Sequence, residues 1–121
     1  MNSYKSAINF LNQHQNYEKK VVYSYREALS LSRVREALRY LGNPERKVPA
    51  IHIAGTNGKG TTASLIANTL SEEGYRIGLF TSPHLRDIRE RIKVSGRMIS
   101  RKDFSSGINR IRERVPKDNQ K

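Results

Sequence analysis

The sequence contains no cysteine and no tryptophan, so disulfide bonds and thiolate metal sites are excluded. It also lacks any apolar run near the roughly 20 residues that a membrane-spanning helix needs. Its first residues, MNSYKSAINFLNQHQ, have no apolar core of the kind found in signal peptides. A cysteine-free chain without such segments is compatible with the reducing cytoplasm. We therefore expect a cytoplasmic protein with no membrane partner.

Acidic residues are scarce beside basic ones: 11 Asp and Glu stand against 23 Lys and Arg, for a formal net charge of +12. Residues 84–114 hold ten Lys and Arg against four Asp and Glu, about half of the excess. A basic stretch attracts nucleic acid or small anions. The basic residues are not interleaved with exposed-looking aromatics, and no nucleic-acid motif is present. We therefore expect no nucleic-acid partner, and interpret the basic stretch either as attraction of small anionic molecules or as solvated charge.

The length of 121 residues suits one domain or a piece of a larger one. The polar stretch 12–25 predicts a loop, and Ser100 followed by Asp103 resembles a capping box at a helix start. Apolar residues recur at helical spacing in four segments, near 3–13, 31–41, 60–73 and 104–115.

Two short apolar runs predict strands on either side of the third helix. Val48–Ala54 reads VPAIHIA, which is typical of a buried parallel strand, and His52 would be a near-core histidine within it. Tyr75–Phe80 would be the second strand, and residues 92–99 a small hairpin turning at Ser95-Gly96. Strand, helix and strand within about thirty residues form a βαβ unit. The predicted fold class is α/β, with a parallel sheet, N-terminal helices and a small β-hairpin.

The stretch HIAGTNGKGTT, residues 52–62, joins the first predicted strand to the third helix. A glycine turn at a helix N-terminus predicts an anion site, because the first N–H groups lack partners and the helix dipole is positive there. Lys59 would reach phosphate oxygens, and Thr61 or Thr62 would help to hold Mg²⁺. The fit to the general P-loop pattern is imperfect: Ile53 replaces the first glycine, and Gly60 separates the lysine from the hydroxyl.

These motifs resemble those of the folylpolyglutamate synthases and the dual-function dihydrofolate synthases, members of the Mur ligase superfamily. The resemblance covers residues 25–115. The glycine stretch with its Lys-Gly-Thr order is similar to the P-loop of this folate branch. LSRV at Leu31–Val34 resembles a family element that usually contains glycine, so Ser32 is a departure. Further matching segments are LRYLGNPE at Leu38–Glu45 and GYRIGLFTSPHLRDIRERIKVSGRMIS at Gly74–Ser100.

The resemblance implies an ATP-dependent ligase with Mg²⁺ that adds L-glutamate to folate or dihydropteroate through an acyl phosphate. Lys59 would be catalytic, and Thr61 and Ser82 would ligate the metal. Pro83 and His84 would be substrate-adjacent by shaping the loop there, and a loop or packing role for His84 is favoured over a catalytic one. Glu90 and Arg91 would be structural or substrate-adjacent, with a solvated charge pair as the equal alternative. The nucleotide-binding residues would be Gly55, Thr56, Asn57, Gly58, Lys59, Gly60, Thr61 and Thr62.

The resemblance also implies a domain organisation. Residues 1–47 would be N-terminal helices of an ATPase domain, 48–115 its incomplete central part, and 116–121 a polar tail. The C-terminal glutamate-binding domain of the family would be absent, so the chain would be a truncated piece, inactive alone, of a monomeric parent. Two alternatives stay open. One is a fragment of a peptidoglycan-type Mur ligase, and the other is a stand-alone nucleotide or nucleic-acid binding module.

Overall fold

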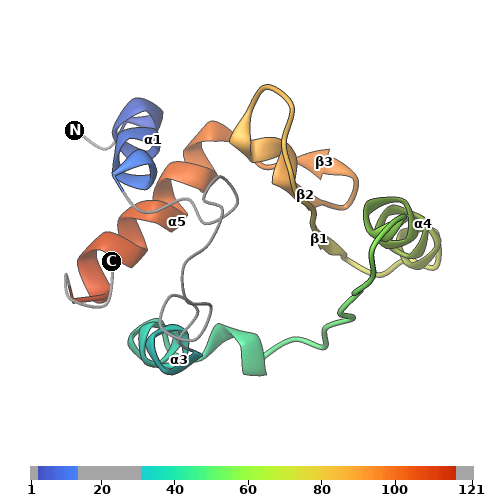
Figure 1. The fold of residues 1–121 in the computed structure, drawn as a ribbon, viewed down its shortest axis with the longest axis horizontal. Coiled ribbons are helices and arrows are strands. Elements are labelled where there is room, and N and C mark those ends of the chain that lie inside the picture. Colours follow the sequence, from blue (N-terminus) through green and yellow to red (C-terminus); the bar gives the residue numbers. More distant parts are fainter. Residues whose placement is uncertain (1–2, 14–30, 117–121) are drawn as a thin grey trace. The chain divides into compact units, whose positions relative to one another are not determined.

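The computed structural model of the chain describes residues 3–13 and 31–116. These residues fall into two compact units, one taking residues up to Pro49 together with those from Ser105 onward, and one comprising Ala50–Phe104. The elements are labelled in Figure 1. Each unit is described by itself below.

The first unit contains helices α1 (Tyr4–Asn12) and α3 (Leu31–Tyr40), a short 3₁₀ helix η1 (Pro44–Arg46), and most of α5 (Arg101–Arg114). The side chain of Ser3 caps α1 by accepting a hydrogen bond from the Ser6 N–H at 3.3 Å. Helix α3 ends where Gly42 takes φ +82°, and the Asn43 N–H then bonds back to the Leu38 carbonyl at 2.8 Å. This closure is the Schellman arrangement, for which glycine is the preferred residue.

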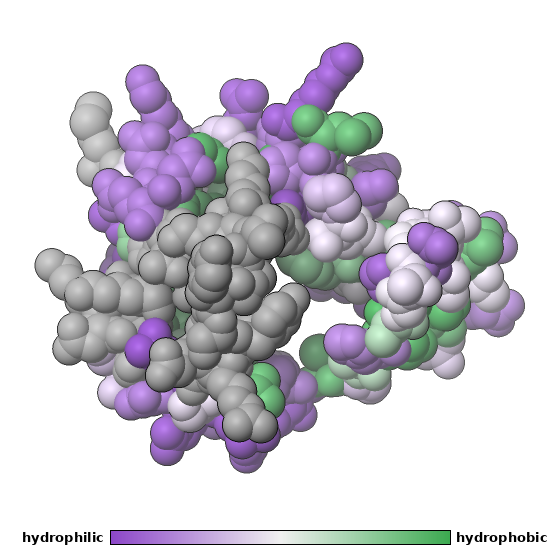
Figure 2. Space-filling view, viewed as in Figure 1, coloured by the Kyte–Doolittle hydropathy of each residue, from purple (hydrophilic) through white to green (hydrophobic). Residues whose placement is uncertain are grey.

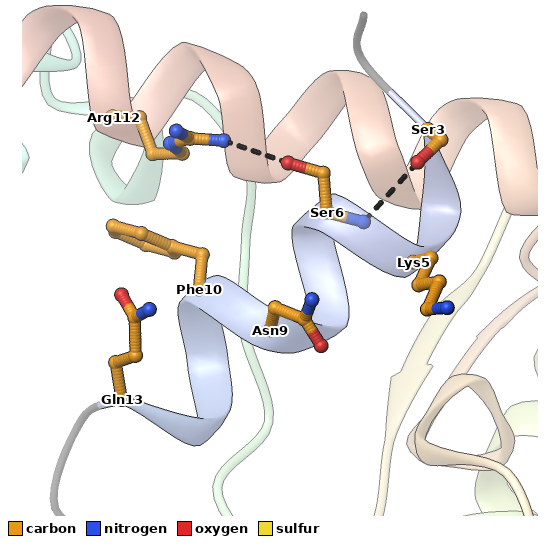
Figure 3. A pocket seen from close by; sticks show the side chains of 7 residues that line it. All are labelled: Ser3, Lys5, Ser6, Asn9, Phe10, Gln13 and Arg112. Carbon is orange, nitrogen blue, oxygen red and sulfur yellow. Dashed lines mark hydrogen bonds between the residues drawn. The ribbon is translucent and has the colours of Figure 1, made fainter.

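Helices α1 and α5 are joined by a polar contact beside a small core. The Arg112 guanidinium donates to the Ser6 hydroxyl at 3.2 Å and lies 5.2 Å from the centre of the Phe10 ring. Figure 3 shows this contact in an open pocket lined by Ser3, Lys5, Ser6, Asn9, Phe10, Gln13 and Arg112. The buried apolar residues of the unit are Ala7, Ile108 and Val115, and no large described side chain is completely buried. The apolar core of this unit is therefore small.

The second unit contains helix α4 (Lys59–Glu72), strand β1 (Gly78–Phe80), the 3₁₀ turn η2 (Ile88–Arg91), strands β2 (Ile92–Val94) and β3 (Arg97–Met98), and the start of α5. Both strand pairs are antiparallel, in the order β1-β2-β3. Leu79 pairs with Lys93, and Lys93 pairs with Met98. The turn between β2 and β3 has positive φ at both Ser95 (+45°) and Gly96 (+76°), which suits the right-handed twist of a tight hairpin.

The predicted parallel βαβ unit is wrong for the described residues. Residues 48–54 form no strand, Val48 and Ile51 are 64% and 65% exposed, and β1 pairs with β2 instead. His52 is exposed rather than near the core. A parallel strand needs a paired neighbour and cover on both faces, whereas the β1–β2 pairing closes a short stretch of chain at a lower entropic cost. The fold class is therefore confirmed in its helices and hairpin, and its parallel sheet is not found among the described residues.

The other sequence predictions have mixed outcomes. The four predicted helices are confirmed as α1, α3, α4 and α5, with ends within a few residues of those expected. The hairpin and its Ser95-Gly96 turn are confirmed, and the second predicted strand is shorter, at Gly78–Phe80. Most of the predicted 12–25 loop and the tail after Pro116 lie outside the described residues. Among the helices that the structure describes, none is long and apolar enough to cross a membrane.

Hydrophobic side chains are exposed on the second unit. Leu65 on α4, Tyr75 and Phe80 are each more than 60% exposed, and Figure 2 shows hydrophobic surface in green around α4 at the right of the view. The apolar face of α4 is thus only partly covered, with Ala67 as its buried residue.

Candidate functional site

The glycine loop leads directly into α4. Gly58 precedes the helix with φ +74° and makes no side-chain cap, and Gly55 has φ +150°. The Thr62 N–H bonds to the Gly58 carbonyl at 2.9 Å. In the described part of the chain, the N–H groups of residues 59–61 have no backbone partner, as expected for the first turn of a helix. The predicted glycine turn at a helix start is confirmed, and its phosphate-binding role stays a prediction.

Lys59 folds back over this loop. Its Nζ donates to the Gly55 carbonyl at 2.6 Å and to the Thr56 carbonyl at 3.1 Å, using two of the three donors of the ammonium group. The lysine is exposed, so its charge is accessible to solvent. The result is a fixed cation in the same short loop as the unpartnered N–H groups.

The loop leaves room for an approaching group. A Cβ atom built at Gly58 or Gly60 would meet no atom within 4 Å beyond the adjoining backbone. Glycine is nevertheless favoured at position 58, because the positive φ there would strain any residue with a Cβ atom. The open space above these glycines is the feature that close approach of phosphate oxygens requires.

The predicted magnesium ligands are hydroxyls on two separate elements. Thr61 and Thr62 lie exposed in the first turn of α4, whereas Ser82 lies exposed in the segment after β1. In the part of the chain that the structure describes, no group of three His, Cys, Asp or Glu side chains is placed to hold a metal. Mg²⁺ keeps several waters and is held by one or two protein groups together with phosphate oxygens. The hydroxyls fit such a site, and a joint site of Thr61 and Ser82 stays a prediction.

Ser82 lies in the segment 82–91, whose backbone is held by the side chain of Glu90. The sequence alone leaves the role of Glu90 open. The Glu90 carboxylate accepts the backbone N–H groups of Leu85, Arg86 and Asp87 at 2.8, 3.1 and 2.8 Å. These bonds, first those from Leu85 and Asp87, hold the pKa of Glu90 below its ordinary value. Glu90 is therefore a structural residue of this segment, and not one of a solvated charge pair.

Two arginines complete the segment. Arg89 forms an ion pair with Asp87 at 2.8 Å and donates to the Ile99 carbonyl at 3.2 Å, which ties the turn η2 to the end of the hairpin. Arg91 donates from Nε to Nδ1 of His84 at 2.8 Å. Asp87 also caps η2 in a capping box with Glu90. The D-x-x-E spacing of Asp87 and Glu90 is a signal for the capping box, and sequence reasoning missed it. The contacts of Arg89 with Ile99 and of Arg91 with His84 join residues at no recognised spacing.

The structure places the remaining predicted site residues as follows. Thr56 and Asn57 are exposed within the glycine loop. Pro83 is exposed and follows a cis peptide bond from Ser82, and His84 is half-buried. The hydrogen bonds of the glycine loop run within residues 55–62, and those of the second segment run within residues 81–99. The sequence-predicted residues thus form two local clusters.

Comparison with curated proteins gives consistent matches. The chain is 42% identical over 85 residues to the dihydrofolate synthase/folylpolyglutamate synthase of Bacillus subtilis, an alignment that covers 70% of this chain and 20% of that protein. It is 39% identical over 114 residues to the folylpolyglutamate synthase of Candida albicans, covering 85% of this chain and 22% of the relative. No protein-family model matches the chain.

Solved structures give the same result. The folylpolyglutamate synthase of Thermotoga maritima matches 91% of this chain and 23% of its own with a TM-score of 0.75 and 34% identity. A folylpolyglutamate synthase complex with AMPPCP and folate matches 93% of this chain and 26% of its own, with a TM-score of 0.79 and 26% identity. The chain thus spans about a fifth to a quarter of the length of these relatives. Sequence and structure together show that this chain belongs, along most of its length, with the folylpolyglutamate and dihydrofolate synthases.

Proposed function

We propose that the chain supplies the phosphate-binding part of an ATP-dependent ligase that adds L-glutamate to folate or dihydropteroate. The observation that carries this proposal is the glycine loop: Gly58 in a left-handed conformation, unpartnered N–H groups at the start of α4, and the Lys59 ammonium held over the loop. One of the structural relatives is named as a complex with an ATP analogue and folate, which supports both ligands of the proposal.

Lys59 and the first turn of α4 would act on the phosphates of ATP. The N–H groups of residues 59–61 would donate to phosphate oxygens, and Lys59 would exchange its contact with the Gly55 carbonyl for a phosphate oxygen. A carboxylate is a poor acylating agent, so the acceptor carboxylate would first take the terminal phosphoryl group of ATP and release ADP. The glutamate amine would then attack the acyl phosphate, with loss of phosphate and of the amine proton. Positioning and charge neutralisation by Lys59 would supply most of what the chain contributes.

Mg²⁺ would neutralise phosphate charge at this site. Thr61 is the residue we assign to it from the glycine loop, and Ser82 the residue from the following segment. Both are exposed hydroxyls, as a metal held mainly by phosphate oxygens and water requires.

The acceptor is left as folate or dihydropteroate, because relatives named dihydrofolate synthase and relatives named folylpolyglutamate synthase both match the chain. The folate names favour this branch over the peptidoglycan branch of the superfamily. A cytoplasmic location, a monomeric parent, and the lack of nucleic-acid and membrane partners stay predictions, as does the proposed division at residues 47 and 115.

Binding of a fluorescent ATP analogue with Mg²⁺, followed by anisotropy, tests the proposal. We expect millimolar affinity, about −4 kcal/mol, because the glycine loop alone makes the contacts. Lys59→Ala should remove most of the binding, and Lys93→Ala, an equal loss of charge on exposed β2, should change it little. Equal losses in both variants would contradict the proposal. With ATP, Mg²⁺, dihydropteroate and glutamate, we expect no phosphate release by the 121 residues alone.

A further inference from the structure

The segment between β1 and β2 is held by side chains that the proposed reaction does not use. Glu90 accepts three consecutive backbone N–H groups, from Leu85, Arg86 and Asp87. Three N–H groups directed at one carboxylate fix the path of the backbone immediately after His84. Glu90 therefore fixes the backbone conformation next to His84, and with it the position of the His84 Cα–Cβ bond.

The hydrogen bond from Arg91 determines the state of the His84 ring. Arg91 Nε–H donates to His84 Nδ1 at 2.8 Å, so Nδ1 is an acceptor and carries no proton. In a neutral imidazole the proton is then on Nε2, which becomes a donor. Among the described residues no hydrogen bond to Nε2 is present, and Nε2 is not one of the fully buried atoms without a partner. The ring thus presents a single N–H donor that no described residue binds.

We propose that Arg91 and Glu90 are positioning residues that hold His84 as a fixed Nε2–H hydrogen-bond donor for the acceptor substrate. The inference rests on the proposed function, to which it adds His84 as a contact of the acceptor substrate. The substrate atom it would meet is a hydrogen-bond acceptor, a carbonyl or carboxylate oxygen or an unprotonated ring nitrogen, and not an N–H group. Arg91 acts through His84, and Glu90 acts through the backbone.

The tautomer can be measured in the 121-residue chain without any ligand. Long-range ¹⁵N–¹H NMR spectra of the imidazole rings would be recorded in a pH series, and the tautomer would be read on the alkaline plateau, where the ring shifts no longer change with pH. His84→Gln assigns the His84 signals, and exposed His52 is the internal reference for an unconstrained ring. We expect a higher population of the Nε2–H form at His84 than at His52. Equal populations would overturn the proposal.

Variants separate positioning from general stability. Arg91→Ala should abolish the difference between His84 and His52, and Arg91→Lys, which keeps a cationic donor, should restore part of it. Arg86→Ala removes an equal charge from the same segment but no side-chain contact to His84, and it should leave the tautomer unchanged. Backbone amide shifts of Leu85 and Asp87 report whether Glu90 still closes the segment. An unchanged His84 tautomer in Arg91→Ala, with these amide shifts retained, would overturn the proposal.

The role of Glu90 has its own test. Glu90→Gln should move the amide shifts of Leu85 and Asp87 and reduce the His84–His52 difference, whereas Glu72→Gln on exposed α4 should do neither. Glu90→Gln with moved amide shifts and an unchanged His84 tautomer would remove Glu90 from the proposal.

A ligand arm distinguishes this inference from the proposed function. Folate should shift His84 Nε2 in the wild-type chain and not in Arg91→Ala. If ATP·Mg²⁺ shifts the amides of Gly58–Gly60 and folate leaves Nε2 unmoved, the substrate-facing role of His84 is wrong while the nucleotide site stands. If ATP·Mg²⁺ leaves those amides unmoved and His84 still shows the fixed tautomer, the proposed function fails while the positioning by Arg91 stands.

Discussion

The glycine loop at 55–58 and the segment at 82–91 are held in place by different kinds of contact. The first is shaped by backbone conformation, with positive φ at Gly55 and Gly58 and a single lysine over its carbonyls. The second is shaped by side chains: two carboxylates and two arginines bond to backbone groups, to one another and to His84. The first loop is accordingly exposed and open to a ligand, whereas the second holds its shape through its own polar network.

The largest effect we expect comes from Arg89→Ala in the second segment. This change removes the ion pair with Asp87 and the bond to the Ile99 carbonyl, and it leaves a part-buried carboxylate with fewer partners. The free energy of unfolding should fall by about 2 kcal/mol, measured by urea denaturation. Arg46→Ala is the matched control, because the Arg46–Glu45 pair is 3.5 Å long with the arginine side chain 79% exposed, and its loss should be below about 0.5 kcal/mol. Equal losses would contradict the distinction between the two pairs.

Smaller changes in stability, of opposite sign, are expected at Gly58 in the first loop and at Gly60 in the first turn of α4. Gly58→Ala should lower the free energy of unfolding by about 1 kcal/mol, because φ is +74° and not because of any neighbouring atom. Gly60→Ala has the same open surroundings but lies within α4, where alanine is the better helix former, so stability should rise by up to ~1 kcal/mol. Denaturation curves followed by circular dichroism test this, and changes of the same sign would show that backbone conformation does not shape the loop.

The smallest effect should appear only as a dependence on pH. The folded-state pKa of Glu90 lies below its ordinary value of about 4.3, so its contribution to stability is present above that pH and is lost as pH falls through the lowered pKa. The difference in unfolding midpoint between the wild type and Glu90→Gln should therefore be largest near neutral pH and shrink as the pH falls through the lowered pKa. Glu72→Gln, which removes a carboxylate from exposed α4, controls for the loss of one charge. A difference that grows on acidification would contradict the assigned contacts.

The helices are predictable from the sequence, because apolar spacing is a local signal. The Ser95-Gly96 hairpin turn and the glycine turn before α4 are predictable as well, because glycine often marks a residue with positive φ. The strand at 48–54 was predicted wrongly, because pairing depends on partners elsewhere in a sheet and the run of apolar residues does not contain them. The capping box of Asp87 and Glu90 could be predicted from its D-x-x-E spacing. The bonds of Glu90 to Leu85 and Arg86 and the bond from Arg91 to His84 could not, because they depend on the path of the backbone.

At the candidate site, similarity to a family motif identifies more residues than spacing and local chemistry do. Spacing alone gave Ser82 no reason to be more than a loop serine, and only its similarity to a family motif suggested a metal ligand. The structure adds that Ser82 is exposed beside a segment closed by Glu90. The role of Thr61 as a candidate metal ligand, by contrast, is predicted from local structure as well, since Thr61 lies in the first turn of a helix that begins after a glycine.

The central claim, that the glycine loop binds polyphosphate, is tested most directly by a chemical-shift titration of the ¹⁵N-labelled chain with ATP·Mg²⁺. We predict shifts concentrated at Gly58, Lys59 and Gly60, saturating in the millimolar range and lost in Lys59→Ala. Shifts confined to the basic residues 86–102, or an unchanged response in Lys59→Ala, would mean that general basicity attracts the anion, and would contradict the claim.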